Sequence, residues 1–251
     1  MSPKSAAPHP ARRRIPAETL AASLAPGTPL WQADQLSTSP LPACPSGHAA
    51  LDAELPGGGW PAGGLTEMLL NEPGCGEIRL LAPALARLAC EADTGAAREL
   101  VWIAPPHPPY APALRCLALP LDRLVWVDAA TEADAAWAAE QVLRCGAGAV
   151  LWWSRRALPA TLRRLHLAAL ESGTPLFGLR PLAQRAQSSP APLRLALEAA
   201  GRRLKVDVFK RRGPALATPL AIDIGSPARR RAVPSPLSHA LALPAPAVVA
   251  A

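Results

Sequence analysis

The chain has 251 residues, enough for one α/β domain with terminal segments, and half of its residues are hydrophobic, so a sizeable core can be buried. The net charge is +7, but residues 19–200 carry 13 basic and 16 acidic residues, so the basic excess lies at the two ends. Basic ends can bind nucleic acid or an acidic protein surface, or can serve solubility alone. No apolar run reaches the length of about 18 residues that a membrane span needs, and we expect no signal peptide.

The cysteines are five in number, and no two of them have C-x-x-C spacing. An odd count without this spacing disfavours both a disulfide framework and a zinc site. We therefore expect buried thiols in a reducing cytoplasm and no bound metal.

Residues 1–28 and 226–251 are rich in Ala, Pro and Arg, and we expect both to be disordered. Between them, residues 29–225 are expected to form one domain in which short apolar segments alternate with segments of helical periodicity. The expected helices are 49–55, 77–93, 112–119, 131–145 and 158–173, and the expected strands are 65–70, 100–104, 124–127, 149–153 and 175–179. Apolar strands separated by helices of this length indicate a mostly parallel sheet with helices on both faces.

Two of these helices have an expected buried face. Thr131, with Asp134 three residues later, is expected to cap the first of them. Its apolar positions are Ala135, Ala138, Val142 and Cys145. In the next helix the apolar positions are Leu158, Leu162, Leu165 and Ala169.

The pattern changes after Pro192, where apolar and polar residues alternate on both sides of a turn at Gly201. This period of two predicts a C-terminal antiparallel β-hairpin over residues 193–212. Its apolar face suits the core, and its other face carries charged residues.

The turn at residues 71–78 lies where a strand–loop–helix unit would hold a nucleotide, and it reads N-E-P-G-C-G-E-I. A phosphate-binding loop reads G-x-x-x-x-G-K-[ST], with a Lys that neutralises phosphate and a hydroxyl that binds Mg²⁺. Here Glu77 stands in the place of the Lys, and a like charge at 4 Å costs roughly 4 kcal/mol at an effective dielectric near 20. Either this is a degenerate phosphate loop or it is an ordinary turn. Its residues of interest are Asn71, Glu72, Gly74, Gly76, Glu77 and Ile78.

The other positions that hydrolysis would need also lack the required groups. The strand 149–153 runs into Ser154-Arg155-Arg156 and not into a metal-binding acid, and the strand 100–104 runs into two prolines and His107. We therefore expect no catalytic residue, no cofactor and no ATPase activity.

Basic residues supply the candidate surfaces for a partner or for DNA, with a solvated charged surface as the alternative. One set belongs to the hairpin: Arg194, Arg203, Lys205, Lys210, Arg211 and Arg212. A second set was expected to form one patch near the carboxyl ends of the strands: Arg155, Arg156, Arg163 and Arg164. Trp152 and Trp153 point to opposite faces of their strand, and burial of both is the ordinary expectation.

Several segments resemble known proteins. The stretches 46–52, 55–63 and 65–67 resemble the start of the RecA core. The Leu-Pro-Gly-Gly-Gly-Trp-Pro form of residues 55–61 is narrower and is similar to the ImuA family, RecA/SulA-related proteins of bacterial mutagenesis cassettes. Residues 163–169 and 204–213 also look like that family, and the resemblance spans about residues 29–225.

This resemblance implies a RecA-like fold and a non-catalytic role in SOS-induced translesion DNA synthesis. It implies an ImuB-type, Y-family-like partner, with RecA as a further candidate. Through the first partner it implies a link to an error-prone replicative-type polymerase and the sliding clamp. The alternative is a SulA-like cell-division inhibitor that binds the tubulin-like division protein. Function here depends on family analogy, since one fold serves many functions.

Overall fold

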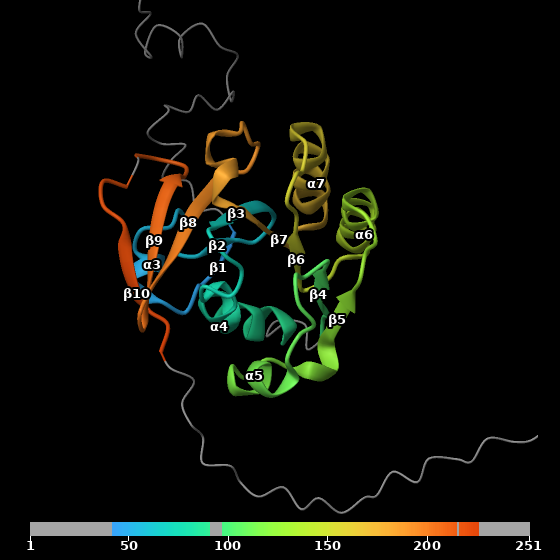
Figure 1. Cartoon of the computed structure of the whole chain (residues 1–251), viewed down its shortest axis with the longest axis horizontal. Helices are drawn as coiled ribbons and strands as arrows, with labels where there is room; N and C mark the ends of the chain where they lie inside the picture. Colours follow the sequence, from blue (N-terminus) through green and yellow to red (C-terminus); the bar gives the residue numbers. More distant parts are fainter. Residues whose placement is uncertain (1–41, 91–96, 215, 226–251) are drawn as a thin grey trace, which may run out of the picture.

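The computed structural model describes residues 42–90, 97–214 and 216–225, so the predictions for residues 1–28 and 226–251 lie outside the described residues. Within them, an eight-stranded sheet is covered by helices on both faces (Figure 1). Its strands are β3 (Gly64–Leu70), β4 (Leu100–Ile103), β5 (Leu124–Val127), β6 (Ala149–Trp153), β7 (Pro175–Pro181), β8 (Leu193–Ala200), β9 (Arg203–Lys210) and β10 (Leu220–Asp223). The short strands β1 (Ala43–Cys44) and β2 (Trp60–Pro61) pair with each other.

The sheet has the strand order β10-β9-β8-β3-β7-β6-β4-β5. The strands β8, β3, β7, β6, β4 and β5 pair in parallel, whereas β9 is antiparallel to both of its neighbours. The predicted fold class, a mostly parallel sheet with a C-terminal antiparallel hairpin, is therefore confirmed. Because β3 lies between β7 and β8, the loop that follows it leaves from the middle of the sheet.

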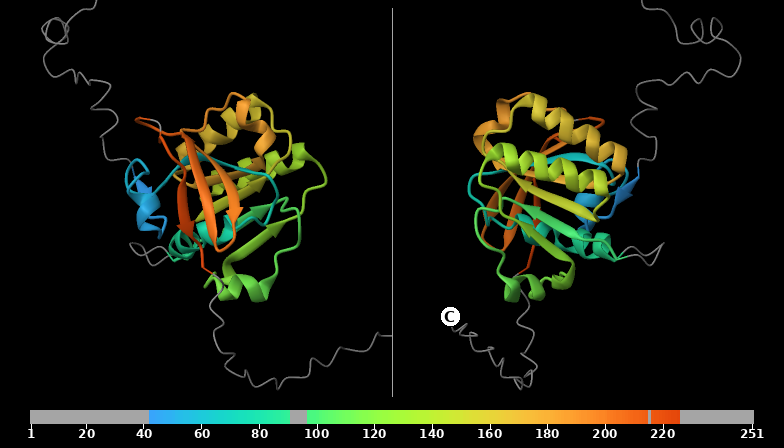
Figure 2. Two further views of the ribbon diagram at one scale, coloured as in Figure 1. Left: turned by 60° about the vertical axis from the view of Figure 1, so that its left-hand side comes forward. Right: turned by 90° about the vertical axis from the view of Figure 1, so that its right-hand side faces the viewer.

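The helices divide between the two faces of the sheet. They are α3 (Ala49–Asp52), α4 (Glu77–Ala89), α5 (Ala111–Cys116), α6 (Glu132–Cys145) and α7 (Pro159–Ser172), with short 3-10 segments η1 (Leu121–Arg123) and η2 (Leu182–Ala186). Helix α4 packs in the core on one face, and α6 and α7 lie side by side on the other (Figure 2). Helix α4 ends at Ala89, earlier than the predicted 93, and α3 ends at Asp52 instead of 55.

Helix α6 begins as predicted, because the Thr131 hydroxyl accepts a hydrogen bond from the Asp134 N–H at 3.1 Å. Its expected buried face was wrong in part. The buried residues are Ala135, Ala136, Ala139, Glu140 and Leu143. In α7 the apolar position Leu158 is 66% exposed, because it precedes the first helical residue and lies outside the helix. Alanine-rich helices give a weak apolar pattern, so more than one face fits.

The glycine-rich motif that carries the family resemblance has a structural role. Trp60 is fully buried and meets the ring of Phe177 edge-on at a centroid distance of 5.7 Å. The Gly59 Cα lies so close to the segment at residues 44–45 that an added Cβ would be 2.2 Å from the carbonyl oxygen of Cys44. The motif thus brings β2 against β1 and places Trp60 under the sheet.

All five cysteines are free thiols: Cys44, Cys75, Cys90, Cys116 and Cys145. The expectation that they are buried was wrong for three of them, because Cys90, Cys116 and Cys145 are exposed. These three occur at or next to the ends of helices α4, α5 and α6.

A buried ion cluster joins three adjacent strands on the face that carries α7. The Glu67 carboxylate of β3 is 2.5 Å from Arg180 of β7 and 2.5 Å from Arg194 of β8. Glu67 and Arg180 are fully buried, and the side chain of Arg194 is 7% exposed. The two positive charges are thus held around one negative charge within the sheet.

The same two arginines fix the connection between β7 and β8. Arg194 donates to the carbonyl oxygens of Gln184 and Arg185, and Arg180 donates to the Ala157 carbonyl and to Oε1 of Gln187. The prediction that Arg194 lies on an exposed face of the hairpin is therefore wrong. The polar side of β8 is covered by the η2 segment, and its arginine is part of the interior.

We predict that Glu67→Gln lowers the free energy of unfolding by about 3–5 kcal/mol, because it leaves two buried guanidinium groups without a counter-charge. The control is Glu198→Gln on β8, which breaks an exposed pair with Lys205 at 3.0 Å and should cost less than about 1 kcal/mol. Urea denaturation of both full-length variants measures the difference. Equal losses in the two variants would contradict this assignment.

Candidate functional site

The loop 71–78 connects the carboxyl end of β3 to the first turn of α4, the position at which an α/β sheet binds ligands. Asn71, Glu72 and Gly74 are exposed, whereas Glu77 is only 3% exposed. Gly76 precedes the helix with φ 123°, a conformation that favours glycine. The backbone therefore follows a glycine-dependent path into the helix start.

The Glu77 side chain folds back onto this loop. Its Oε1 accepts a hydrogen bond from the Gly74 N–H at 2.7 Å, and its Oε2 accepts one from the Gly76 N–H at 3.0 Å. Backbone N–H groups at a helix start are the donors that hold phosphate in a nucleotide loop. Here an internal carboxylate already satisfies two of them, and it carries the charge that a phosphate would bring.

The Cys75 thiol lies next to the Glu77 carboxylate, and its pKa reflects this environment. Burial, followed by the charge and hydrogen bonding of Glu77, raises the pKa of Cys75 to about 12. The side chain therefore stays a neutral thiol at physiological pH.

The end of the described chain closes the loop from another side. A Cβ on Gly76 would lie 2.4 Å from Cδ1 of Ile224, so the residue after β10 occupies the space beside the loop. The Arg79 guanidinium donates to the Gly225 carbonyl oxygen at 3.2 Å and holds this segment against α4. The sequence pattern did not predict β10, so it gave no sign that the residues after this strand lie beside the loop.

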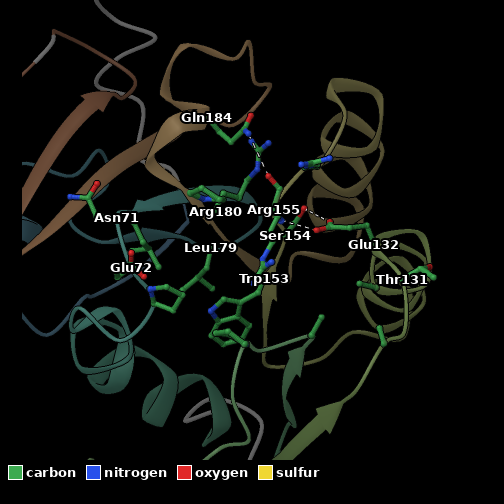
Figure 3. A pocket seen from close by; sticks show the side chains of 18 of the residues that line it. Asn71, Glu72, Thr131, Glu132, Trp153, Ser154, Arg155, Leu179, Arg180 and Gln184 are labelled. Carbon is green, nitrogen blue, oxygen red and sulfur yellow. Dashed lines mark hydrogen bonds between the residues drawn. The ribbon is translucent and has the colours of Figure 1, made fainter.

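A second carboxylate acts in the same way at the carboxyl end of β6. The Glu132 side chain, from the first turn of α6, accepts from the Ser154 hydroxyl at 2.6 Å and from the Arg155 N–H at 2.7 Å (Figure 3). The position where hydrolysis would need a metal-binding acid thus has a serine whose hydroxyl is engaged by a carboxylate from a neighbouring element.

These elements surround a cavity of about 710 Å³ at the carboxyl edge of the sheet (Figure 3). The ends of β3, β4, β6 and β7 contribute its walls, and Glu72, Glu132, Arg155, Arg156 and Arg180 are its charged lining residues. His107 is exposed and does not line it. Among the described residues, no group of three or more His, Cys, Asp or Glu side chains is placed to hold a metal ion.

The four arginines expected to form one patch are divided between two hollows. Arg155 and Arg156 are exposed at the cavity, whereas Arg163 and Arg164 line a separate hollow along α7. Arg164 also pairs with Glu140 of α6 at 2.8 Å. The expectation of a single patch was therefore wrong, because α7 carries its arginines away from the strand ends.

The basic side chains of the hairpin differ in whether they already have an ion-pair or hydrogen-bond partner. Lys205 pairs with Glu198, and Arg211 pairs with Glu54 at 2.9 Å. The Lys210 ammonium donates to the Ser189 carbonyl oxygen at 2.8 Å. Within the described part of the chain, Arg203 and Arg212 are exposed and make no ion pair, so they are the available cations among the six predicted in the hairpin.

The two adjacent tryptophans of β6 point to opposite faces, as expected. Trp152 is fully buried among the residues under α6 and α7. Trp153 packs on the other face against Trp102 at a centroid distance of 5.6 Å, and it also borders the cavity. Burial is thus complete for Trp152 and partial for Trp153.

His166 of α7, within the segment 163–169, has a structural role that the sequence pattern did not indicate. Its Nδ1 accepts a hydrogen bond from the Leu65 N–H at 3.0 Å, which ties the helix to the start of β3. Burial, followed by the charge of Lys210, lowers the pKa of His166 below its ordinary value. The neutral ring is therefore the form that the fold stabilises.

The comparisons with known proteins found similar chains only among solved structures. No protein-family model matches the chain, and none of the curated proteins does. Among solved structures, SulA from Pseudomonas aeruginosa is 28% identical over 97% of its own chain and 47% of this one, with a TM-score of 0.39. Among the described residues, no helix has the length and apolar character to cross a membrane.

We predict that acid weakens the wild-type fold through His166. The unfolded ring takes up a proton near pH 6.5, whereas the folded ring takes it up only at lower pH. This contribution to stability is complete above pH 6.5 and is lost as the pH falls through the lower folded pKa. His166→Asn keeps an acceptor but does not titrate. Its unfolding free energy should therefore fall less between about pH 7 and 5 than that of the wild type. Identical losses in chemical denaturation would contradict this.

Proposed function

We propose that this chain is a non-catalytic adaptor in SOS-induced, error-prone translesion DNA synthesis. The proposed partner is an ImuB-type, Y-family-like protein, with RecA as a second candidate partner. Through the first partner the chain would be connected to an error-prone replicative-type polymerase and the sliding clamp. The resemblance of residues 46–67, 163–169 and 204–213 to the ImuA family supports the pathway and the partners.

The observation that supports a non-catalytic role is the position of the Glu77 carboxylate. It accepts hydrogen bonds from Gly74 and Gly76, the amides from which a nucleotide loop would bind phosphate. A nucleotide would have to expel a buried carboxylate from these donors and leave it without them, or bind beside it against its charge. Neither the Lys nor the hydroxyl of a working loop is present to compensate.

The second acid, Glu132, supports the same conclusion at the end of β6. Its carboxylate engages the Ser154 hydroxyl and the Arg155 amide, so these groups are not free to place a metal or a water. What the carboxyl edge offers to a partner is exposed charge, from Arg155 and Arg156 on the cavity. Such groups suit binding of a protein or of a phosphate backbone.

We predict that the full-length chain forms a complex with the purified ImuB-type protein, and that removing its gene lowers damage-induced mutation to the uninduced level. The double variant Arg203→Glu/Arg212→Glu removes the available hairpin cations without disturbing buried contacts. Its affinity for the ImuB-type protein should be lower than that of the wild type. A truncation at residue 193 would not serve, because it removes β8 and the buried Arg194. Affinity is read by isothermal titration, and mutation frequency by resistance plating after ultraviolet irradiation.

Three results would count against this proposal. ATP hydrolysis stimulated by single-stranded DNA would show that the chain is an enzyme. Unchanged mutation frequency on deletion would exclude the pathway. Filamentous cells on overexpression, without an effect on mutation, would assign the chain to the alternative, a SulA-like inhibitor of cell division.

A further inference from the structure

Two hollows of about 750 and 600 Å³ lie along α7, and neither shares a lining residue with the carboxyl-edge cavity. The first lies between the start of α7 and residues 188–190. The second lies between the later turns of α7 and two further walls, residues 61–63 with Pro42 and Pro56, and residues 192–193. Helix α7 and the segment 188–193 contribute lining residues to both hollows. We refer to them together as the α7 groove.

The wall that α7 contributes includes two exposed leucines that the core does not use. Leu167 lines the first hollow and is 56% exposed, and Leu170 lines the second and is 53% exposed. Two leucines three residues apart lie on one face of a helix. Adjacent exposed leucines in a hollow, flanked by the prolines of the opposite wall, are typical of a surface that another chain covers.

The charged residues that line the α7 groove are all basic: Arg163 and Arg164 in the first hollow and Arg212 in the second. No Asp or Glu lines either hollow, and the one acid of α7, Glu171, lies outside both. Arg164 is paired with Glu140, whereas Arg163 and Arg212 have no ion-pair partner among the described residues. The complementary ligand therefore combines carboxylates with large apolar side chains.

The terminal segments of this chain do not have that character. Pro42, the first described residue, lines the second hollow, but residues 1–41 carry four basic and two acidic residues. Residues 226–251 carry three arginines and no acid. A basic segment would be repelled by Arg163 and Arg212, so charge favours a different chain as the occupant.

We propose that the α7 groove binds a short acidic segment of a partner protein, whose apolar side chains contact Leu167 and Leu170 and whose carboxylates pair with Arg163 and Arg212. Helix α7 has 14 residues and is about 21 Å long, which matches about six residues of an extended chain. The inference rests on the proposed adaptor function and specifies the chemistry of the partner segment that this surface recognises.

The test uses the full-length chain and a phage library of random dodecapeptides, since the natural segment is unidentified. The groove variant is Arg163→Glu/Leu167→Glu. The matched control is Arg115→Glu/Leu158→Glu, which alters an exposed arginine and an exposed leucine outside the groove. Melting followed by circular dichroism verifies that both variants are folded. The most enriched peptide is then synthesised with a fluorescein label for polarisation titrations.

We expect the selected peptides to be net acidic with at least two large apolar residues. Their affinity should fall about tenfold or more in the groove variant and remain unchanged in the control, and it should weaken with added salt. Net basic peptides, equal binding by the groove variant, or no enrichment would overturn the proposal. So would a labelled single-stranded oligonucleotide whose binding is lost in the same variant, because the groove would then belong to nucleic acid.

One more variant distinguishes an internal occupant. If peptides bind only after Leu30, Trp31 and Leu36 are replaced by Ser, the chain's own N-terminal segment covers the groove and the proposal of an acidic partner is wrong. The selection involves neither DNA damage nor cell growth. If the selection yields no groove-dependent peptide but deletion of the gene still lowers mutation frequency, only the groove proposal is rejected. If peptides bind the groove but deletion leaves mutation frequency unchanged, only the pathway is rejected.

Discussion

The pairing of the Glu77 carboxylate with the Gly74 and Gly76 amides determines what this scaffold can do. A helix that begins at the end of a central parallel strand can bind an anion, because the first N–H groups of the helix have no partner within it. The chain supplies that anion itself, from the first residue of the helix. The Gly74 and Gly76 amides are thereby satisfied without a ligand, and this pairing is the basis of the proposal that the loop does not bind nucleotide.

The surrounding structure is consistent with the proposal of a binding protein in which the loop 71–78 is held by internal contacts. Ile224, beyond β10, fills the space beside Gly76, and Glu132 engages the end of β6, so both flanks of this carboxyl edge of the sheet are held by internal contacts. The buried Glu67 cluster fixes the η2 connection behind it. Exposed apolar and basic side chains then remain on α7 and the hairpin, where a partner can reach them.

The sequence predicted the order of strands and helices well, because alternation of apolar segments with helical periodicity depends on local pattern alone. It predicted Glu77 as an obstacle to phosphate, but not its hydrogen bonds, which depend on the path that Gly74 and Gly76 give the backbone. Arg194 was misplaced, since alternation indicates solvent for a polar position unless another segment, here η2, covers the strand. Glu67 gave no signal, because one acid in an apolar strand looks like an exposed position until its two arginines, far along the chain, are brought beside it.

The central claim is tested most directly by the backbone amide resonances of Gly74 and Gly76 in the full-length protein, recorded by nuclear magnetic resonance during a titration with Mg²⁺ and ATP. Amides that donate to the Glu77 carboxylate should keep their chemical shifts throughout the titration, and both should move upfield in Glu77→Gln. Saturable shifts of these two amides in the wild-type protein would show that nucleotide displaces the carboxylate, and the account of a closed, non-catalytic loop would be wrong.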